Sequence, residues 1–404
     1  MSAIENTLAS RIDLLPGAAN AVLKMLGAMR GGSLDITLPN SERVNVGEGH
    51  RVASLEIRDW GVFETLISKG SIGFAEDFVN GLWRTDNLAA LLTLSAQNRD
   101  AMSRAIHGNA LRLLGYKIWH SLRANTRKGA RRNIEAHYDL GNDFYQLWLD
   151  ETMTYSSALF AEPHRPLAEA QRAKYRRILE QLGAKPGQRI LEVGCGWGGF
   201  AEIATLEYGC EVLGLTLSPA QLKFARERAE RGGFGELAAF ELCDYRDVRG
   251  HYDHIVSIEM YEAVGERFWP SYFQQLRDRV APGGRVVIQA ITIEDSLFGF
   301  YRKNPDFIQR YIFPGGMLAS PERIRKQAAK AGLEVVDDLA FGLDYARTLA
   351  IWHERFNAVR EQVAAQGFDE RFMRLWQFYL AYCEAGFRAG STDVHHYTFA
   401  AAPA

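Results

Sequence analysis

The sequence predicts an α/β protein of two domains, in which a smaller α+β domain precedes a larger domain built on a doubly wound, mostly parallel sheet. The chain has 404 residues, more than one hydrophobic core usually serves. From about residue 175, apolar strand-like runs alternate with amphipathic helical patterns, which is typical of parallel sheets with crossover helices. Within this alternation, residues 190–200 form an apolar run that breaks into a glycine turn before a helical pattern.

The N-terminal region, up to about residue 100, mixes short elements. An apolar stretch covers Leu14 to Met29, a hairpin is expected around Leu34 to Leu38, and a helical pattern runs from Asp59 to Leu94. These elements predict a small α+β unit.

The segment 101–134 is one-sided in charge, with eight Lys or Arg residues and no Asp or Glu. Apolar residues recur in it at i, i+4 spacing from Met102 to Leu122, which predicts an amphipathic helix. Such a helix could lie on an anionic bilayer surface, or it could join the domains and expose its basic face to solvent. The sequence leaves both interpretations open.

The larger domain is predicted element by element from its hydrophobic pattern. An aromatic-rich insertion, 296–322, separates the fifth strand of the sheet from the sixth. Outside it, the expected elements are strand 189–193, helix 200–208, strand 211–215, helix 219–231, a strand ending near 243, strand 254–258, helix 268–280, strands 285–293 and 333–339, helices 344–365 and 369–389, and strand 395–400.

The glycine turn predicts a nucleotide-type cradle. Gly194, Gly196 and Gly198 have no Cβ, so the turn can adopt positive φ and a ligand can lie against bare backbone amides. The strand ends at Glu192, Thr216, Asp244–Tyr245 and Glu259 should rim one crevice at the carboxyl edge of the sheet. Thr216 stands where a ribose-binding carboxylate would indicate NAD, which weakens that interpretation.

For three residues near this crevice the sequence allows more than one role. Gln221 could complete a capping box with Ser218, which gives it a structural role. Asp244 could accept a hydrogen bond from an adenine amino group, with Tyr245 packed on the ring, although an Asp-Tyr pair in a loop is ordinarily a turn.

Composition narrows the class of protein. A formal net charge of -2 argues against a generally basic nucleic-acid binder. The four cysteines are scattered, with no C-x-x-C pair and no metal-ligand spacing, so we expect a reduced, cytoplasmic protein without a metal site. No window approaches the ~18 apolar residues of a membrane span, and no export signal is expected.

Six motifs then appear in a fixed order. They are His137–Asn142, Met153–Ser157, the glycine loop, Asp244–Asp247, Tyr261–Gly265 and Tyr311–Gly316. Together they closely resemble the cyclopropane-fatty-acyl-phospholipid synthase family of S-adenosylmethionine-dependent methyltransferases, strongly from about residue 130 and more loosely before it. The resemblance implies a class I, Rossmann-like methyltransferase domain with a seven-stranded sheet at 126–404. It also implies an N-terminal lipid-docking or dimerisation domain at 1–125.

The resemblance also implies the chemistry. S-adenosylmethionine would donate a methyl group to a cis double bond in an acyl chain of a membrane phospholipid. The cofactor-binding positions would be Tyr155, Ser156, Glu192, Gly194, Gly196, Thr216, Gln221, Asp244 and Tyr245. A bicarbonate ion would serve as the base, held at Ser157, Glu262, Gln289, Ile291 and Tyr345.

Two of these five positions depart from the family pattern, because Ser157 replaces a Cys and Gln289 replaces a His. Both can still donate hydrogen bonds to an anion, but the option of a cationic imidazolium is lost. The product is therefore left open between a cyclopropane and a methyl-branched or otherwise methylated chain. We expect Glu262 to handle the proton, with or without bicarbonate. Glu259 could line the cofactor or cap the following helix, and the structural role is favoured.

Tyr261, Tyr301, Phe307 and Tyr311 are expected to wall an acyl channel, although aromatic clusters are more often plain core. The expected partners are phospholipid acyl chains, an anionic membrane surface and a second copy in a homodimer, with the protein bound peripherally to the cytoplasmic membrane. Two alternatives remain: a small-molecule N-methyltransferase, which would not need the basic segment, and a non-catalytic lipid-binding protein, which would not need the glycine loop, Glu262 and Tyr345.

Overall fold

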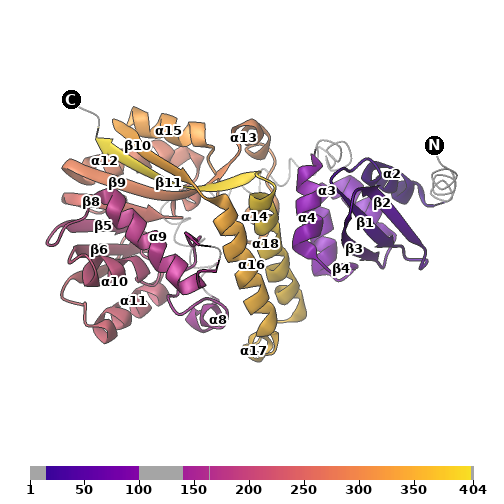
Figure 1. The fold of residues 1–404 in the computed structure, drawn as a ribbon, viewed down its shortest axis with the longest axis horizontal. Helices are drawn as coiled ribbons and strands as arrows, with labels where there is room; N and C mark the ends of the chain where they lie inside the picture. The colour runs from indigo at the N-terminus through magenta and orange to yellow at the C-terminus, as the bar shows by residue number, and fades with distance from the viewer. Residues whose placement is uncertain (1–14, 100–139, 163, 402–404) are drawn as a thin grey trace.

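The computed structural model describes residues 15–99, 140–162 and 164–401, which form two domains joined by helical contacts (Figure 1). The predicted basic helix within 101–134 lies outside the described residues. No helix in the described ranges combines the length and apolarity needed to cross a bilayer.

The N-terminal domain is a four-stranded sheet in the order β2-β1-β3-β4, covered by helices. The predicted hairpin is confirmed, because β1 pairs antiparallel with β2, and β3 pairs parallel with β1. The elements are α2 (Gly17–Leu26), β1 (Gly32–Thr37), β2 (Arg43–Glu48), β3 (Arg51–Ile57), α3 (Gly61–Val79), β4 (Trp83–Thr85) and α4 (Leu88–Gln97).

The helical pattern expected from Asp59 to Leu94 is interrupted by β4. Trp83 is fully buried, stacks on Phe74 with 4.1 Å between ring centroids, and donates from Nε1 to the Phe74 carbonyl at 2.8 Å. Its backbone pairs with Ile57 of β3. This tertiary anchor holds the chain extended, so the prediction of one continuous helical pattern was wrong at this point.

The larger domain contains a seven-stranded sheet in the order β10-β11-β9-β8-β5-β6-β7. Pairs β5·β6, β5·β8, β6·β7 and β8·β9 are parallel, and β11 runs antiparallel between β9 and β10. The predicted seven-stranded, mostly parallel sheet is confirmed. Its strands are β5 (Arg189–Val193), β6 (Glu211–Thr216), β7 (Ala238–Leu242), β8 (Tyr252–Ile258), β9 (Val280–Ile293), β10 (Leu333–Ala340) and β11 (Thr392–Ala401).

Helices cover both faces of this sheet, as expected for a doubly wound fold (Figure 1). One core packs α9, α10 and α11 on the sheet, and a second core packs α12 and α15 on the opposite face. The bounds are α8 (Asn142–Gln146), α9 (Leu167–Leu182), α10 (Gly199–Leu206), α11 (Pro219–Gly232), η1 (Tyr261–Ala263), η2 (Glu266–Phe268), α12 (Trp269–Arg279) and α15 (Pro321–Lys330).

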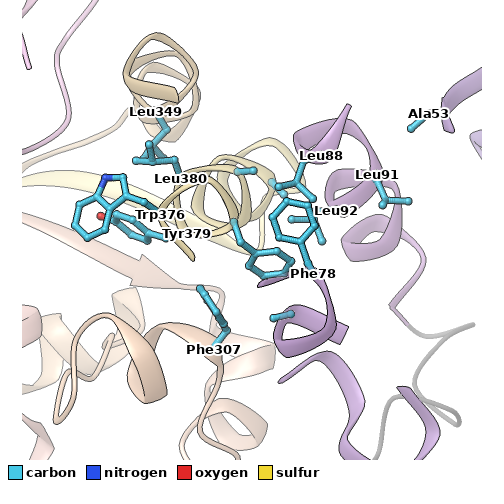
Figure 2. Packing of buried hydrophobic residues seen from close by; sticks show 14 of the residues in the cluster. Ala53, Phe78, Leu88, Leu91, Leu92, Phe307, Leu349, Trp376, Tyr379 and Leu380 are labelled. Carbon is cyan, nitrogen blue, oxygen red and sulfur yellow. The ribbon is translucent and has the colours of Figure 1, made fainter. Parts of the chain in front are cut away.

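Of the remaining helices, α14 (Phe307–Tyr311) and α18 (Glu370–Arg388) contact helices α3 and α4 of the N-terminal domain. The aromatic insertion forms α13 (Asp295–Tyr301) and α14, and the C-terminal helices are α16 (Gly342–Ala358), α17 (Arg360–Ala365) and α18. Figure 2 shows α18 contributing Trp376, Tyr379 and Leu380 to a shared core with Phe78, Leu88, Leu91 and Leu92 of the N-terminal domain. The two domains therefore share one apolar core through α18.

Candidate active site

A cavity of about 830 Å³ begins at the carboxyl ends of β5, β6 and β8 and continues into the N-terminal domain. At the sheet end it is lined by the glycine loop and by Glu259, Glu262 and Tyr345. At the other end its walls are apolar side chains of the N-terminal domain, namely Val22, Leu26, Leu34, Leu55, Ile57, Val62, Phe63, Leu66, Leu91 and Leu92. One continuous space therefore joins the predicted cofactor crevice to the neighbouring domain.

The glycine loop has the predicted backbone. Gly194, Gly196 and Gly198 have φ of 89°, 51° and 83°, which side chains other than glycine rarely adopt. A Cβ on Gly196 would meet nothing within 4 Å, so the bare amide edge faces open space in the cavity. A Cβ on Gly198 would lie 3.3 Å from Ala225 and Phe240, so this glycine instead permits close helix packing. The loop thus provides one open face for a ligand.

Eight of the nine predicted cofactor-binding residues line the cavity: Tyr155, Ser156, Glu192, Gly194, Gly196, Thr216, Gln221 and Tyr245. Asp244 does not. Its carboxylate accepts from Arg246 Nε at 2.8 Å and Nη2 at 2.5 Å, and from the Arg246 amide at 3.0 Å. The Asp-Tyr pair therefore forms a charged turn in which Tyr245 reaches the cavity wall, and the role of Asp244 in cofactor binding stays a prediction.

The predicted capping box at Ser218 is half confirmed. Ser218 Oγ accepts from the Gln221 amide at 3.3 Å, as expected for an N-cap. The Gln221 side chain does not reach back, because its Oε1 accepts from Thr216 Oγ1 at 3.0 Å, and Thr216 Oγ1 accepts from the Ser218 amide. The side chain of Gln221 is thereby turned to the cavity wall.

Glu192 offers the clearest test of the cofactor prediction. It lines the cavity at the end of β5, is 2% exposed, and its Oε2 has no hydrogen-bond partner among the described residues. Burial raises its pKa well above the usual range. An unpaired buried carboxyl oxygen is costly unless a ligand supplies a donor. The ammonium group of S-adenosylmethionine would supply such a donor. The carboxyl group of Glu192, at the edge of the glycine-loop crevice, therefore fits this cofactor.

Of the five residues predicted to hold an anion, four donate hydrogen bonds to two carboxylates, those of Glu259 and of the fifth residue, Glu262. Glu259 Oε1 accepts from the Ser157 amide at 2.8 Å and from Gln289 Nε2 at 2.7 Å, and its Oε2 accepts from the Tyr345 hydroxyl at 2.6 Å. Glu262 Oε1 accepts from the Ile291 amide at 2.5 Å. The structure thus brings all five positions together, with Glu259 in their midst.

Glu259 corrects the interpretation favoured from sequence. It does not cap the following 3₁₀ helix, whose N-cap residue is Met260 and makes no side-chain cap bond. Its φ of 47° is in the left-handed region, where a non-glycine residue typically costs about 1–3 kcal/mol. This turn at the end of β8 rotates the side chain into the donor set. Backbone strain at a buried carboxylate is a feature expected of a functional position.

The two carboxylates differ in their hydrogen bonds. Burial and the nearby charge of Glu259 raise the pKa of Glu262 to about 8, and its Oε2 has no partner among the described residues. Burial also raises the pKa of Glu259, but hydrogen bonds from Tyr345, Ser157 and Gln289 and the charge of Lys174 oppose this rise. Of the two, Glu259 has the hydrogen bonds and the nearby Lys174 that favour its charged form, so the proton of the pair is held more firmly by Glu262.

Ser157 and Lys174 lie next to these two carboxylates. The hydroxyl of Ser157 is turned away and donates to the Ala158 carbonyl at 3.0 Å, so Ser157 serves Glu259 through its backbone amide. Lys174 is fully buried, and its Nζ donates to Ser156 Oγ at 2.6 Å and to Gln171 Oε1 at 2.7 Å. Lys174 therefore joins the cofactor-binding segment to α9, and its charge also lowers the pKa of Glu259, a role that the sequence did not suggest.

Only one of the four aromatic residues predicted to wall an acyl channel does so. Tyr301 lines the cavity, and its hydroxyl accepts from the Leu318 amide at 3.3 Å. The other three predictions were wrong. Tyr261 is buried beside Trp269 and Phe273 because η1 turns it into the core, Phe307 packs on Phe378, and Tyr311 donates to Glu76 at 2.5 Å. These three rings pack against neighbouring helices and not along the cavity, as is usual for aromatic clusters.

Three residues near these carboxylates were missed from sequence: Glu259 as a site residue, Lys174, and His396 of β11, whose Nε2 lies 2.7 Å from Gln289 Oε1. For Lys174 a signal did exist, because a lysine on the apolar stripe of α9, between Gln171 and Tyr175, is unusual. For His396 the alternation of β11 puts it on the same face as Val394 and Thr398, but nothing local identifies its partner.

The chain is similar to known lipid-modifying enzymes. Residues 125–397 match the family model described as mycolic acid cyclopropane synthetase. The tuberculostearic acid methyltransferase UfaA1 of Mycobacterium tuberculosis is 44% identical over 338 residues, which is 81% of this chain and 78% of the relative. The cyclopropane-fatty-acyl-phospholipid synthase of Escherichia coli K12 is 33% identical over 354 residues, 87% of this chain and 88% of the relative.

A solved structure agrees with these matches. Mycolic acid cyclopropane synthase CmaA1, complexed with SAH and CTAB, superposes with a TM-score of 0.63 at 32% identity, over 67% of this chain and 97% of that chain. The fold and the glycine-loop domain are therefore shared with proteins that bind the demethylated form of S-adenosylmethionine.

Proposed function

The chain belongs to the mycolic acid cyclopropane synthetase family, and from this premise we propose that it methylates a cis double bond in an acyl chain of a membrane phospholipid and releases an open-chain, methylated olefin. Membership makes it an S-adenosylmethionine-dependent methyltransferase. The lipid substrate, the open-chain product and the membrane association are the parts that we propose.

S-adenosylmethionine, when bound, supplies an electrophilic methyl group on a positively charged sulfur. Three features of the cavity fit S-adenosylmethionine. They are the open backbone face of Gly196, the carboxyl oxygen of Glu192 that has no partner among the described residues, and the wall formed by Tyr155, Thr216 and Tyr245. At the sheet end of the cavity, Tyr345 and Gln289 are buried and enclose the partly buried Glu259. A dry, preorganised site suits an alkene, which is a weak nucleophile and forms a cation that water would trap.

One observation carries the assignment of the base. Three of the five groups that the family resemblance assigns to bicarbonate already donate to Glu259, and a fourth, the Ile291 amide, donates to Glu262. We infer that the carboxylate of Glu259 occupies the place of that anion and acts as a built-in base. No external bicarbonate is then needed, and the charge of the site is fixed to the chain.

The proposed step balances on these groups. The π pair of the alkene forms the new bond to the methyl carbon, the carbon–sulfur bond breaks with its pair left on sulfur, and the adjacent chain carbon becomes cationic. A hydride shift moves the positive charge to the methylated carbon, and Glu259 takes a proton from a neighbouring carbon, whose C–H pair becomes the new double bond. Glu262, held neutral by its raised pKa of about 8, adds no second negative charge.

The open-chain product follows from the shape of the base. A carbonate-sized anion presents three oxygens, whereas Glu259 presents two, and both already accept hydrogen bonds. The lone pair that remains free on the Glu259 carboxylate has a fixed place relative to the backbone. It can therefore reach one proton of the lipid cation more easily than the others. The name of the relative that is 44% identical, a tuberculostearic acid methyltransferase, supports a methyl transfer without ring formation, and the cyclopropane synthase is 33% identical.

The cavity supports a lipid as the substrate. Beyond Tyr301 it continues between α18 and the N-terminal domain, where Leu34, Leu55 and Leu91 are among the apolar wall residues. An apolar passage that extends across a domain boundary suits one long acyl chain better than a small amine. We therefore propose that residues 1–125 include an acyl-binding domain.

Analysis of the products tests this function. Purified protein incubated with labelled S-adenosylmethionine and vesicles of a defined cis-monoene phospholipid should add one CH₂ to the acyl chain, because a methyl group enters and a proton leaves. The product should take up hydrogen over a catalyst, as an olefin does. Vesicles of the saturated phospholipid are the control and should remain unlabelled. A product that resists hydrogenation is a ring and would overturn the open-chain proposal, and unlabelled lipid throughout would overturn the lipid substrate.

Membrane docking through the basic segment 101–134 is a further part of the proposal, as is a homodimer formed through the N-terminal domain. With eight cationic residues and no acidic ones, this segment should bind anionic bilayers at about 1 kcal/mol per nearby charge. We expect flotation with anionic liposomes at low salt and its loss at high salt, because exposed charges are screened. Neutral liposomes are the control. Equal binding to both liposome types would contradict electrostatic docking.

A further inference from the structure

A line of hydrogen bonds leads from Glu259 away from the cavity through the sheet. Gln289 of β9 lies opposite His396 of β11 in the strand register, so the two side chains share one face. Gln289 Nε2 is 2.7 Å from Glu259 Oε1, and Gln289 Oε1 is 2.7 Å from His396 Nε2. Gln289 and His396 are fully buried, and Glu259 is partly buried where it lines the cavity.

The line continues to the surface on the other side of His396. Arg177 of α9 places Nη1 3.2 Å from His396 Nδ1 and donates from Nη2 to Asp337 Oδ2 at 2.6 Å. The ring of Phe341 packs edge-on against the imidazole, with 4.7 Å between centroids. His396 is therefore held in place on three sides, by Arg177, Gln289 and Phe341.

The direction of each hydrogen bond in this line is determined by chemistry. A guanidinium can only donate, so His396 Nδ1 must accept from Arg177. Burial and the charge of Arg177 keep the imidazole neutral by lowering its pKa well below the usual range. The single ring proton is then on Nε2 and is donated to Gln289 Oε1. The amide group of Gln289 must consequently point its NH₂ at Glu259.

We propose that His396, polarised by Arg177, is a positioning residue that fixes the amide of Gln289 with its donor side toward the base Glu259. This rests on the proposed function of Glu259. Without His396 the Gln289 amide could turn over and present its oxygen to the Glu259 carboxylate. The contact would then change from a hydrogen bond to a repulsion between two acceptors, which disfavours the charged form of the base.

Two nearly isosteric variants test the polarity of the line. In H396Q the new side chain can accept from Arg177 and still donate to Gln289, so we expect kcat within about threefold of wild type. In H396E the new carboxylate can pair with Arg177 but can only accept, so Gln289 must turn its NH₂ away from Glu259. We expect a 10–100-fold fall in kcat, as for other outer partners of reacting groups, with KM for S-adenosylmethionine and lipid unchanged.

The neighbouring histidine provides the matched control. His395 bonds Asp338 from the opposite face of β11, at 2.7 Å from Nδ1 to Oδ1, so H395Q should leave kcat unchanged. If H396E does not fold, H396F removes both ring nitrogens and should show the same fall in kcat. Wild-type kcat in folded H396E or H396F would overturn the proposal, as would equal losses in H396Q and H396E. Full activity of E259Q would instead overturn the proposal that Glu259 is the base. Failure of the proposed function can therefore be distinguished from failure of the role proposed for His396.

Discussion

Replacing Glu259 by Gln is expected to lower turnover by about 10²–10⁴-fold while binding of S-adenosylmethionine is unchanged, because a neutral amide cannot take the proton that leaves the lipid cation. The variant retains the size of the side chain and its place among Ser157, Gln289 and Tyr345. Calorimetry of cofactor binding and single-turnover kinetics with a cis-monoene lipid measure the two quantities separately.

Glu262 provides the matched control for this prediction. Since burial and Glu259 raise its pKa to about 8, it is already neutral at pH 7, and E262Q should cost less than about tenfold in turnover. This expectation revises the prediction from sequence, in which Glu262 handled the proton. A greater loss in E262Q than in E259Q would restore that original assignment.

The substitution E259G is a second test of Glu259 as the base. E259G removes the base, relieves the left-handed backbone at φ 47°, and leaves the donors of Ser157, Gln289 and Tyr345 around a space the size of a carboxylate. We expect an inactive but stable protein whose turnover is partly restored by bicarbonate or formate. Absence of rescue by either anion, in a protein that still binds the cofactor, would speak against an anion site at this place.

The second large effect is expected at Lys174. Its side chain is fully buried, and burial lowers its pKa to about 7, although the charges of Glu259, Asp150 and Glu192 oppose this shift. K174M removes this amine and its hydrogen bonds to Ser156 Oγ and Gln171 Oε1, and the loss of a donor to these buried groups should lower the free energy of unfolding by about 1–3 kcal/mol. Urea denaturation at pH 7 measures this loss.

The same variant should alter the pH dependence of turnover. Without the nearby cation the pKa of Glu259 rises, so the limb of the pH–rate profile on which the base becomes ionised should move to higher pH. K223M is the control, because Lys223 is exposed and its pair with Glu227 spans 3.8 Å at the surface; we expect less than about 0.5 kcal/mol and no shift of the profile. An unshifted profile in folded K174M would show that Lys174 serves packing alone.

The sequence by itself determined the fold of the larger domain and the cofactor crevice. Alternating apolar runs and helical patterns are local signals, and the strands from Arg189 to Ala401 were placed from them. The glycine loop is equally local, since positive φ at Gly194, Gly196 and Gly198 is a property of those residues. The order of the motifs identified the family resemblance before any contact was known.

Only the tertiary structure decided which carboxylate is at the centre of the site. Glu259 and Glu262 are three residues apart in one turn, and no local pattern indicates which of them the backbone directs toward Ser157, Gln289 and Tyr345. These donors come from positions 30 to 102 residues away along the chain. Likewise, Tyr261 and Phe307 are buried in the core and Tyr311 bonds Glu76, because the packing of distant helices determines where each aromatic ring lies.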